Sequence, residues 1–290
     1  MIYLLLTVLL NAFLFILFKV FPKYKIDTLQ AIVVNYVTCV VTGSLYLGEF
    51  PINTKSSSQP WFNWALAMGC MYIGLFNFIA YCTKQYGVAT ASVANKLSLV
   101  IPVIAAILLY GERLSSINTV GIIIALPAVY LSISNKGEQN NKHGILLPML
   151  LFLFSGMLDT IIKYVEHHYL QNEREQAVFP VHVFAIAASI GIVMITILII
   201  TGKTKLHYRN IIAGILLGIP NYFSIYYLIR LLNNDSMQSA VAIALNNIGI
   251  VLVSVLAGTL LLKEKMNKQR ITGLVLAVIS IILIAMIDGR

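Results

Sequence analysis

The sequence predicts an all-α polytopic membrane protein, with ten transmembrane helices arranged as two inverted five-helix repeats. Two properties of its composition predict the membrane: 59% of the 290 residues are hydrophobic and only 11% are charged, and the mean hydropathy is +0.87. A soluble domain needs more polar surface than this. The third observation is a succession of apolar runs of about 20 residues, the length that crosses a hydrocarbon core about 30 Å thick.

Each apolar run is interpreted as one helix. The runs are continuously apolar and do not alternate in polarity, which argues against transmembrane strands. A helix also satisfies all of its own backbone polar groups inside lipid. Connectors rich in turn residues separate the runs, and none is long enough to form a domain. The ten expected helices cover residues 1–20, 29–48, 61–82, 86–110, 117–134, 144–164, 178–201, 210–232, 236–262 and 271–287.

The basic residues are divided unequally between the two predicted faces of the membrane. Alternate connectors carry thirteen Lys and Arg residues, whereas the other face, with both termini, carries five. The positive-inside rule places the thirteen-charge face in the cytoplasm and both termini outside. We therefore expect the net charge of +9 to reflect the orientation of the protein in the membrane, and we do not expect nucleic-acid binding. We expect an integral multi-pass protein of a bacterial inner membrane, as a monomer or a homodimer.

The chain resembles itself when it is shifted by 152 residues. Residues 89–134 then align with 241–286 without a gap, and nine of the forty-six positions are identical, among them Asn95 with Asn247 and Gly121 with Gly273. Glu112 and Glu264 also match, and a weaker match near the repeat starts pairs Lys19 with Lys163. We therefore expect a first repeat over 1–134, a connector over 135–143 and a second repeat over 144–290.

Five crossings in each repeat is an odd number, so the second repeat is expected to be inverted relative to the first. Inverted repeats are typical of secondary transporters, which bind substrate near the membrane midplane and open alternately to each side. The alternative is a duplication retained only for symmetric packing. Polar residues at mid-depth favour transport, because symmetric packing alone does not need them.

Lys96 is the deepest cation of any predicted helix. A charge at mid-membrane costs about 3 kcal/mol on insertion scales, so it is a functional candidate. Ser92 lies one turn before it and Asn95 beside it, and the repeat places Asn246 and Asn247 opposite. These five residues are predicted to bind substrate. Two alternatives for Lys96 remain: a hydrogen-bonded structural role and a role in proton coupling.

Asp159 is the only acid well within a predicted helix. Counting 1.5 Å per residue puts it about 13 Å from Lys96 in depth, beyond the reach of a lysine side chain. Lys163 follows at the i+4 spacing that favours an ion pair on one helix. We expect Asp159 and Lys163 to form a local pair at a gate, with substrate contact or coupling to a proton as the alternative.

Two prolines, Pro102 and Pro220, predict kinks inside helices. Tyr222 and Tyr226, one turn apart after Pro220, are candidates to line the substrate pocket, although aromatic residues at this spacing also serve packing. The three cysteines show no paired spacing, and no cofactor or metal site is expected. Catalytic motifs are absent, so the sequence does not predict an enzyme.

The stretch GVATASVANKLSLVIPVIAAILLYGERLSSINTVGIIIALPAVYLS, residues 87–132, resembles the fourth and fifth helices of EamA-like transporters in the drug/metabolite transporter superfamily. The shared pattern is a small and polar run, a mid-helix proline, an alanine-rich end, a Gly-Glu turn and a helix that opens with glycine. ANKL at 94–97 and ALNN at 244–247 also resemble the Asn-Lys element that holds substrate in related nucleotide-sugar carriers. The second copy lacks the lysine, which argues against a nucleotide sugar.

The resemblance implies ten helices in two repeats and termini in the cytoplasm, opposite to the charge count. The sequence therefore predicts a secondary transporter of a small polar metabolite, anionic or zwitterionic. A flippase for lipid-linked headgroups and a channel are the alternatives.

Overall fold

The computed structural model describes residues 2–102, 104–105, 116–133, 146–232, 239–264 and 266–285. Within these ranges the chain is helical and has no β-strand, which confirms the all-α class. Two short 3₁₀-helices, η1 (Phe21–Tyr24) and η2 (Ser56–Ser58), lie in connectors. The α-helices are α1 (Ile2–Val20), α2 (Thr28–Leu47), α3 (Phe62–Tyr86), α4 (Val88–Leu97), α6 (Ser116–Ile133), α7 (Leu146–Tyr169), α8 (Glu173–Ile200), α9 (Tyr208–Leu232), α10 (Ser239–Leu260) and α11 (Lys268–Ala285).

In the described ranges, seven helices are long and apolar enough to cross a bilayer. They are α1, α2, α3, α7, α8, α9 and α10. The exposed side chains of the bundle include many large apolar residues, such as Ile123, Val193 and Leu256, each more than half exposed. Lipid solvates such a surface better than water does. Helices α4, α6 and α11 were also expected to cross, and the count of ten crossings stays a prediction.

The fourth predicted helix, 86–110, is not one regular helix in its described part. Helix α4 ends at Leu97, and residues 98 and 99 form a turn before the helix resumes. The cause lies at Pro102, which has no N–H for the carbonyl of Ser98 and whose ring would crowd that carbonyl. The Ser98 carbonyl accepts a hydrogen bond from the N–H of Ile101 instead, at 2.9 Å. The helix is therefore interrupted just before Pro102, as the proline predicted, and its bend angle stays a prediction.

Helices α7 and α8 are longer than predicted, and only residues 170–172 separate them. The Asn172 side chain accepts a hydrogen bond from the N–H of Glu175 at 2.9 Å, which caps the first turn of α8. Glu173 and Glu175 also place negative charge at the helix start, where the dipole favours it. The 28 residues of α8 measure about 42 Å, so its polar first turns extend past the hydrocarbon core.

Helix α2 packs closely against α9 through glycines. A Cβ atom added to Gly218 would lie 2.5 Å from Thr38 Cβ, and one added to Gly214 would lie 2.4 Å from Val34 Cβ. Without a hydrophobic driving force between helices in lipid, small residues that allow close backbone approach are a main source of association. The α2–α9 contact therefore depends on these two positions.

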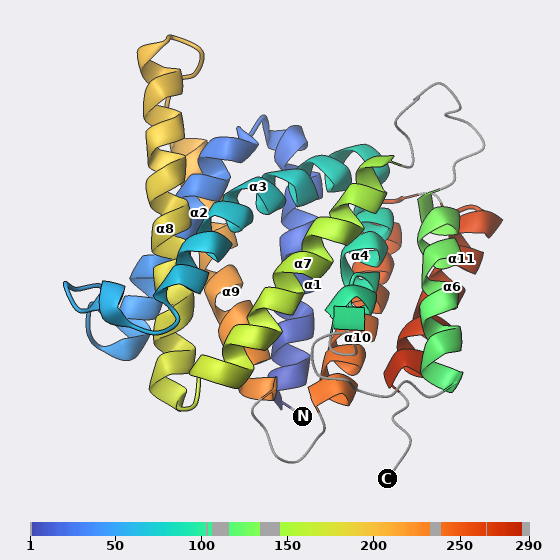
Figure 1. Cartoon of the computed structure of the whole chain (residues 1–290). Helices are drawn as coiled ribbons and strands as arrows, with labels where there is room; N and C mark the ends of the chain where they lie inside the picture. Colours follow the sequence, from blue (N-terminus) through green and yellow to red (C-terminus); the bar gives the residue numbers. More distant parts are fainter. Residues whose placement is uncertain are drawn as a thin grey trace.

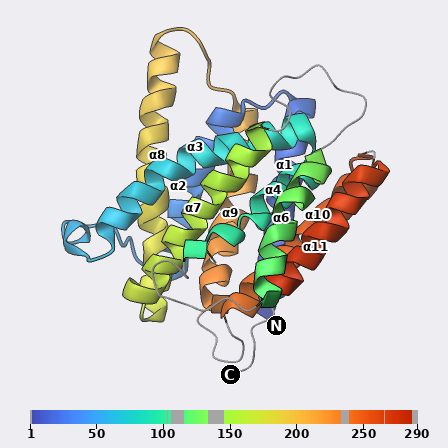
Figure 2. The same ribbon diagram turned by 45° about the vertical axis from the view of Figure 1, so that its right-hand side comes forward.

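Helices α6 and α11 lie side by side at one edge of the bundle in both views (Figures 1 and 2). Two glycines make the contact close. A Cβ atom on Gly121 would meet the backbone N of Ile284 at 2.9 Å, and one on Gly273 would meet the backbone N of Ser132 at 2.5 Å. The Ser280 hydroxyl donates to the Gly121 carbonyl at 2.7 Å. Gly121 and Gly273 are the glycines matched by the 152-residue shift, and their contacts are reciprocal.

The connectors fall at two opposite ends of the bundle (Figure 1). Connectors 21–27, 201–207 and 261–264 lie at the upper end in that view, which we call the lysine-rich face. Helix α1 begins and α11 ends at the opposite face, together with connector 48–61. Helix α7 runs obliquely across the front of the bundle between the two faces.

Candidate functional site

Helices α4 and α7 meet through two hydrogen bonds between polar side chains. The Asn95 amide donates to the Ser155 hydroxyl at 2.7 Å. The Ser98 hydroxyl donates to the Asn95 carbonyl at 2.5 Å and shares its proton with Asp159 Oδ2 at 3.3 Å. Ser155 and Asp159 are one turn apart on α7, so a single polar strip of that helix faces the end of α4. Close approach is possible at Gly156, where an added Cβ would lie 2.4 Å from Ile101.

Helix α10, from the second half of the chain, also contributes to the site. The Asn247 side-chain amide donates to the main-chain carbonyl of Lys96 at 3.2 Å. That carbonyl lies in the last turn of α4, where carbonyls lose their i+4 partners. Asn246, the residue before Asn247 on α10, is buried, and its Oδ1 atom has no hydrogen-bond partner among the described residues. The expected meeting of both asparagines with Lys96 is therefore confirmed for Asn247 by a direct contact.

We call this group the polar cluster. It comprises Asn95 and Lys96 of α4, Ser98 just after that helix, Ser155 and Asp159 of α7, and Asn246 and Asn247 of α10. Ser92 takes no part through its hydroxyl, which is buried and donates to the Ala89 carbonyl of its own helix at 3.0 Å.

Lys96 and Asp159 carry opposite charges in the polar cluster, and both side chains are half-buried. Asp159 contacts Ser98, which is two residues after Lys96. Among the described residues three ion pairs are closer than 4.0 Å, and none of them joins Lys96 to Asp159. The two charges are thus neighbours that do not neutralise each other by direct contact.

The predicted separation of Lys96 and Asp159 by about 13 Å in depth is wrong. Asp159 contacts Ser98, which is two residues from Lys96. Counting along straight helices failed because α4 stops being regular at Leu97 and α7 is oblique (Figure 1). The predicted ion pair between Asp159 and Lys163 is likewise not among the described pairs, since the carboxylate turns toward α4. Whether Lys163 forms part of a gate stays a prediction.

Tyr222 and Tyr226 lie in a different contact region, between α9 and helices α2 and α8. Tyr222 is fully buried, and its hydroxyl donates to the Ala177 carbonyl at 3.3 Å. The Tyr226 and Tyr46 hydroxyls are 2.8 Å apart. None of these described contacts reaches the polar cluster. The tyrosines pack and bridge helices here, and a role in binding substrate stays a prediction.

A second polar group lies at the lysine-rich face, where the α10–α11 connector meets the start of α4. The Glu264 carboxylate accepts hydrogen bonds from the N–H of Val88 at 2.9 Å and from that of Ala89 at 3.4 Å, and Lys19 Nζ lies 3.6 Å away. Glu264 therefore caps the start of α4 from the α10–α11 connector. A Cβ atom on Gly87, whose φ is +92°, would lie 2.9 Å from this carboxylate, so the position requires glycine.

The sequence missed Ser98, Ser155 and the capping role of Glu264. Ser155 had one available signal, because serine beside glycine in the run FSGM is a small polar pair suited to a helix crossing. Glu264 also had a signal in the sequence, because it aligns with Glu112 when the chain is shifted by 152 residues. Glu112 itself lies outside the described residues.

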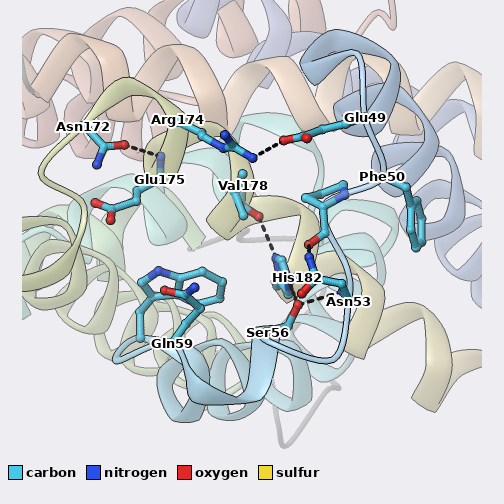
Figure 3. A pocket seen from close by; sticks show the side chains of 12 residues that line it. Glu49, Phe50, Asn53, Ser56, Gln59, Asn172, Arg174, Glu175, Val178 and His182 are labelled. Atoms are coloured by element: carbon cyan, nitrogen blue, oxygen red, sulfur yellow. Dashed lines mark hydrogen bonds and ion pairs between the residues drawn. The ribbon is translucent and has the colours of Figure 1, made fainter.

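A polar pocket of about 290 Å³ lies at the opposite face, between connector 48–61 and the start of α8 (Figure 3). Arg174 pairs with Glu49 across it. His182 donates from Nδ1 to the Val178 carbonyl at 3.0 Å and lies 2.8 Å from the Ser56 hydroxyl, so it ties η2 to α8. The described residues contain no group of three or more His, Cys, Asp or Glu side chains that could hold a metal ion.

Comparison with known proteins agrees with this architecture. Residues 1–134 match the EamA-like transporter family. A protein of Haemophilus influenzae described as uncharacterized is 25% identical, with 94% of each chain covered. A solved crystal structure is similar in fold, with a TM-score of 0.60 and 14% identity over 97% of this chain and 98% of the other. The family that residues 1–134 of this integral multi-pass membrane protein match is part of the drug/metabolite transporter superfamily.

Proposed function

We propose that the chain is a secondary transporter of a small zwitterionic metabolite, of the size and charge pattern of an amino acid, which binds at the polar cluster. The observation that carries the proposal is the pair Lys96 and Asp159: opposite charges in one cluster, half-buried, and not in direct contact. Each charge costs about 3 kcal/mol inside a membrane. A ligand that offers a carboxylate to Lys96 and an ammonium to Asp159 offsets both costs at once.

The uncharged members of the cluster support orientation of such a ligand. The Asn246 Oδ1 atom is a buried acceptor without a described partner, and a buried polar group left unpaired costs free energy. A ligand N–H group is a suitable donor for it. A purely anionic ligand would leave Asp159 repelling it, so the zwitterionic form of the prediction is favoured over the anionic form.

Alternating access is supported by the arrangement of the two proposed repeats, 1–134 and 144–290. The cluster draws α4 from one repeat and α7 and α10 from the other, so a rocking motion between them would change the exposure of the site. The reciprocal contacts of Gly121 and Gly273 are those that a two-fold relation between repeats produces. Asp159 is the acid available for coupling to a proton.

The test is counterflow in vesicles that contain the purified protein. Vesicles preloaded with one amino acid are expected to accumulate labelled zwitterionic amino acids in a saturable manner, and to accumulate amines or monocarboxylates at least tenfold more slowly. Lys96→Met is expected to reduce this uptake at least tenfold. Lys203→Met, which removes a lysine from an exposed connector, is the matched control and is expected to retain the wild-type rate.

Uptake that does not saturate and shows no acceleration by internal substrate would identify a channel and overturn the proposal. Wild-type uptake in Lys96→Met would also overturn it. A flippase would instead require uptake to follow lipid-linked headgroups and to ignore free amino acids.

A further inference from the structure

Helices α3 and α7 leave an apolar groove between them on the outside of the bundle. Its volume is about 560 Å³, which is within the usual range for ligand sites, about 300 to 1,000 Å³. Every side chain that lines it is apolar or a thiol. The lining residues are Cys70, Met71, Gly74, Leu75, Phe78, Leu147, Leu150, Phe154 and Met157.

The groove faces the membrane. Phe154 and Met157 are about half exposed and Cys70 is exposed. On α7 the lining positions recur at intervals of three and four residues, the period of one helix face. Ser155 and Asp159, which face α4, lie on another side of the same helix. Only the thickness of α7 therefore separates the groove from the polar cluster.

Measured along the helix axes, the walls of the groove are about as long as one leaflet of a bilayer is thick. From Cys70 to Phe78 the α3 wall measures about 12 Å, and from Leu147 to Met157 the α7 wall measures about 15 Å. Half of a hydrocarbon core about 30 Å thick is also about 15 Å. The groove is open at its centre, since a Cβ atom added to Gly74 would meet nothing within 4 Å.

One end of the groove points to the lysine-rich face. Phe78 and Leu147 lie toward that face, because α3 ends there and α7 begins there (Figure 1). Lys84 is exposed in the last turn of α3, six residues or about 9 Å beyond Phe78. Lys84 is therefore a cation at the end of α3 that lies beyond the groove, on the side of the lysine-rich face.

We infer that the α3–α7 groove is a binding site for one acyl chain of an anionic phospholipid from the leaflet at the lysine-rich face. The chain fills the apolar walls, and the phosphate lies near Lys84. A lipid held there supports α7 from outside, on the side away from the strip that contacts α4. The site is thus independent of the identity of the transported metabolite.

The first experiment measures the phospholipid that remains with the full-length protein after extensive washing in mild detergent, by phosphorus content and mass spectrometry. The wild type is expected to retain about one phospholipid per chain, enriched in anionic headgroups relative to the membrane. Gly74→Phe fills the groove and is expected to lower retention at least fivefold. Val193→Phe, on the lipid-facing side of α8, adds a similar ring elsewhere and is expected to leave retention unchanged.

Lys84→Gln tests the headgroup separately and is expected to remove the anionic enrichment while a lipid is still retained. A wild type that retains no phospholipid overturns the inference, as does a folded Gly74→Phe that retains as much as the wild type. Unchanged enrichment in Lys84→Gln overturns the assignment of the phosphate to that lysine.

Discussion

The side-chain amide of Asn247, on α10, donates a hydrogen bond of 3.2 Å to the main-chain carbonyl of Lys96, on α4. This bond joins the two proposed repeats at the residue that carries the membrane cation. It also uses the backbone of Lys96 and leaves the ammonium group available. Substitution of Asn247 should therefore mainly lower stability, whereas substitution of Asn246 should mainly weaken substrate binding.

Asn247→Ala removes the donor and leaves the Lys96 carbonyl unpaired. Interhelical hydrogen bonds in membranes average about 0.6 kcal/mol and reach about 1.7 kcal/mol, and a loss of free energy of unfolding within that range is expected. The Oδ1 atom of Asn246 has no described partner. Asn246→Ala should therefore lose less stability than Asn247→Ala, but it should bind substrate more weakly. Unfolding in denaturant and substrate titration on both variants measure the difference. Equal losses of stability would contradict the assignment.

Asp159→Asn keeps a side-chain oxygen that can accept from Ser98 but removes the charge. If the ligand ammonium lies near this carboxylate, transport of zwitterions should fall at least tenfold, which corresponds to about 1.4 kcal/mol. Binding of an analogue that lacks the amine should be retained or improved. Counterflow and competition assays check both. Unchanged zwitterion transport would show that Asp159 takes no part in recognition.

Glu264→Gln weakens the cap on α4. A helix cap contributes about 0.5 to 2 kcal/mol, so a loss of about 1 kcal/mol of unfolding free energy is expected. Lys19→Met, which removes only the partly exposed partner of the ion pair, should cost less, because exposed pairs contribute about 0 to 1 kcal/mol. The thermal unfolding of both variants is the measurement. If Lys19→Met loses more thermal stability than Glu264→Gln, the Glu264 carboxylate contributes mainly through its ion pair with Lys19, and the capping role is contradicted.

Gly218→Ala should destabilise the α2–α9 contact. The new Cβ would lie 2.5 Å from Thr38 Cβ and 2.6 Å from the Asn35 carbonyl oxygen, and overpacking of this kind costs about 1 to 3 kcal/mol. Gly74→Ala is the matched control, because its Cβ meets nothing within 4 Å and alanine favours a helix by about 1 kcal/mol. If Gly218→Ala is as stable as the wild type, α2 and α9 can move apart at this contact at little cost in free energy, and the close contact is not required for stability.

Cysteine labelling from outside intact cells determines the orientation. The charge count predicts that Lys203→Cys, in a connector of the lysine-rich face, is protected from a membrane-impermeant maleimide. Ser57→Cys, exposed at the opposite face, should be labelled. The reverse pattern would support cytoplasmic termini, as the family resemblance implies. Lys142, in the predicted connector between repeats, lies outside the described residues, so these two positions are better probes.

The sequence determined the helical class and the approximate positions of the helices. An apolar run of about 20 residues can satisfy its backbone in lipid only as a helix, so each run specifies its element without help from its neighbours. The sequence also identified Lys96 and Asp159, because charges inside such runs are rare. The shift of 152 residues predicted Asn246 and Asn247 opposite Lys96, and the structure places Asn247 in contact with the Lys96 carbonyl.

Tertiary structure alone decided how these residues meet. Depth counted along straight helices separated Lys96 from Asp159, whereas the break before Pro102 and the oblique course of α7 bring Asp159 to Ser98. The i+4 spacing predicted an ion pair between Asp159 and Lys163 on one helix. In the structure the Asp159 carboxylate instead contacts Ser98, beside the end of α4. The spacing of residues along the sequence predicts on which face of its own helix a side chain lies. Only the crossing angles and breaks of the helices fix which charge lies beside which, because those depend on packing between segments far apart in the chain.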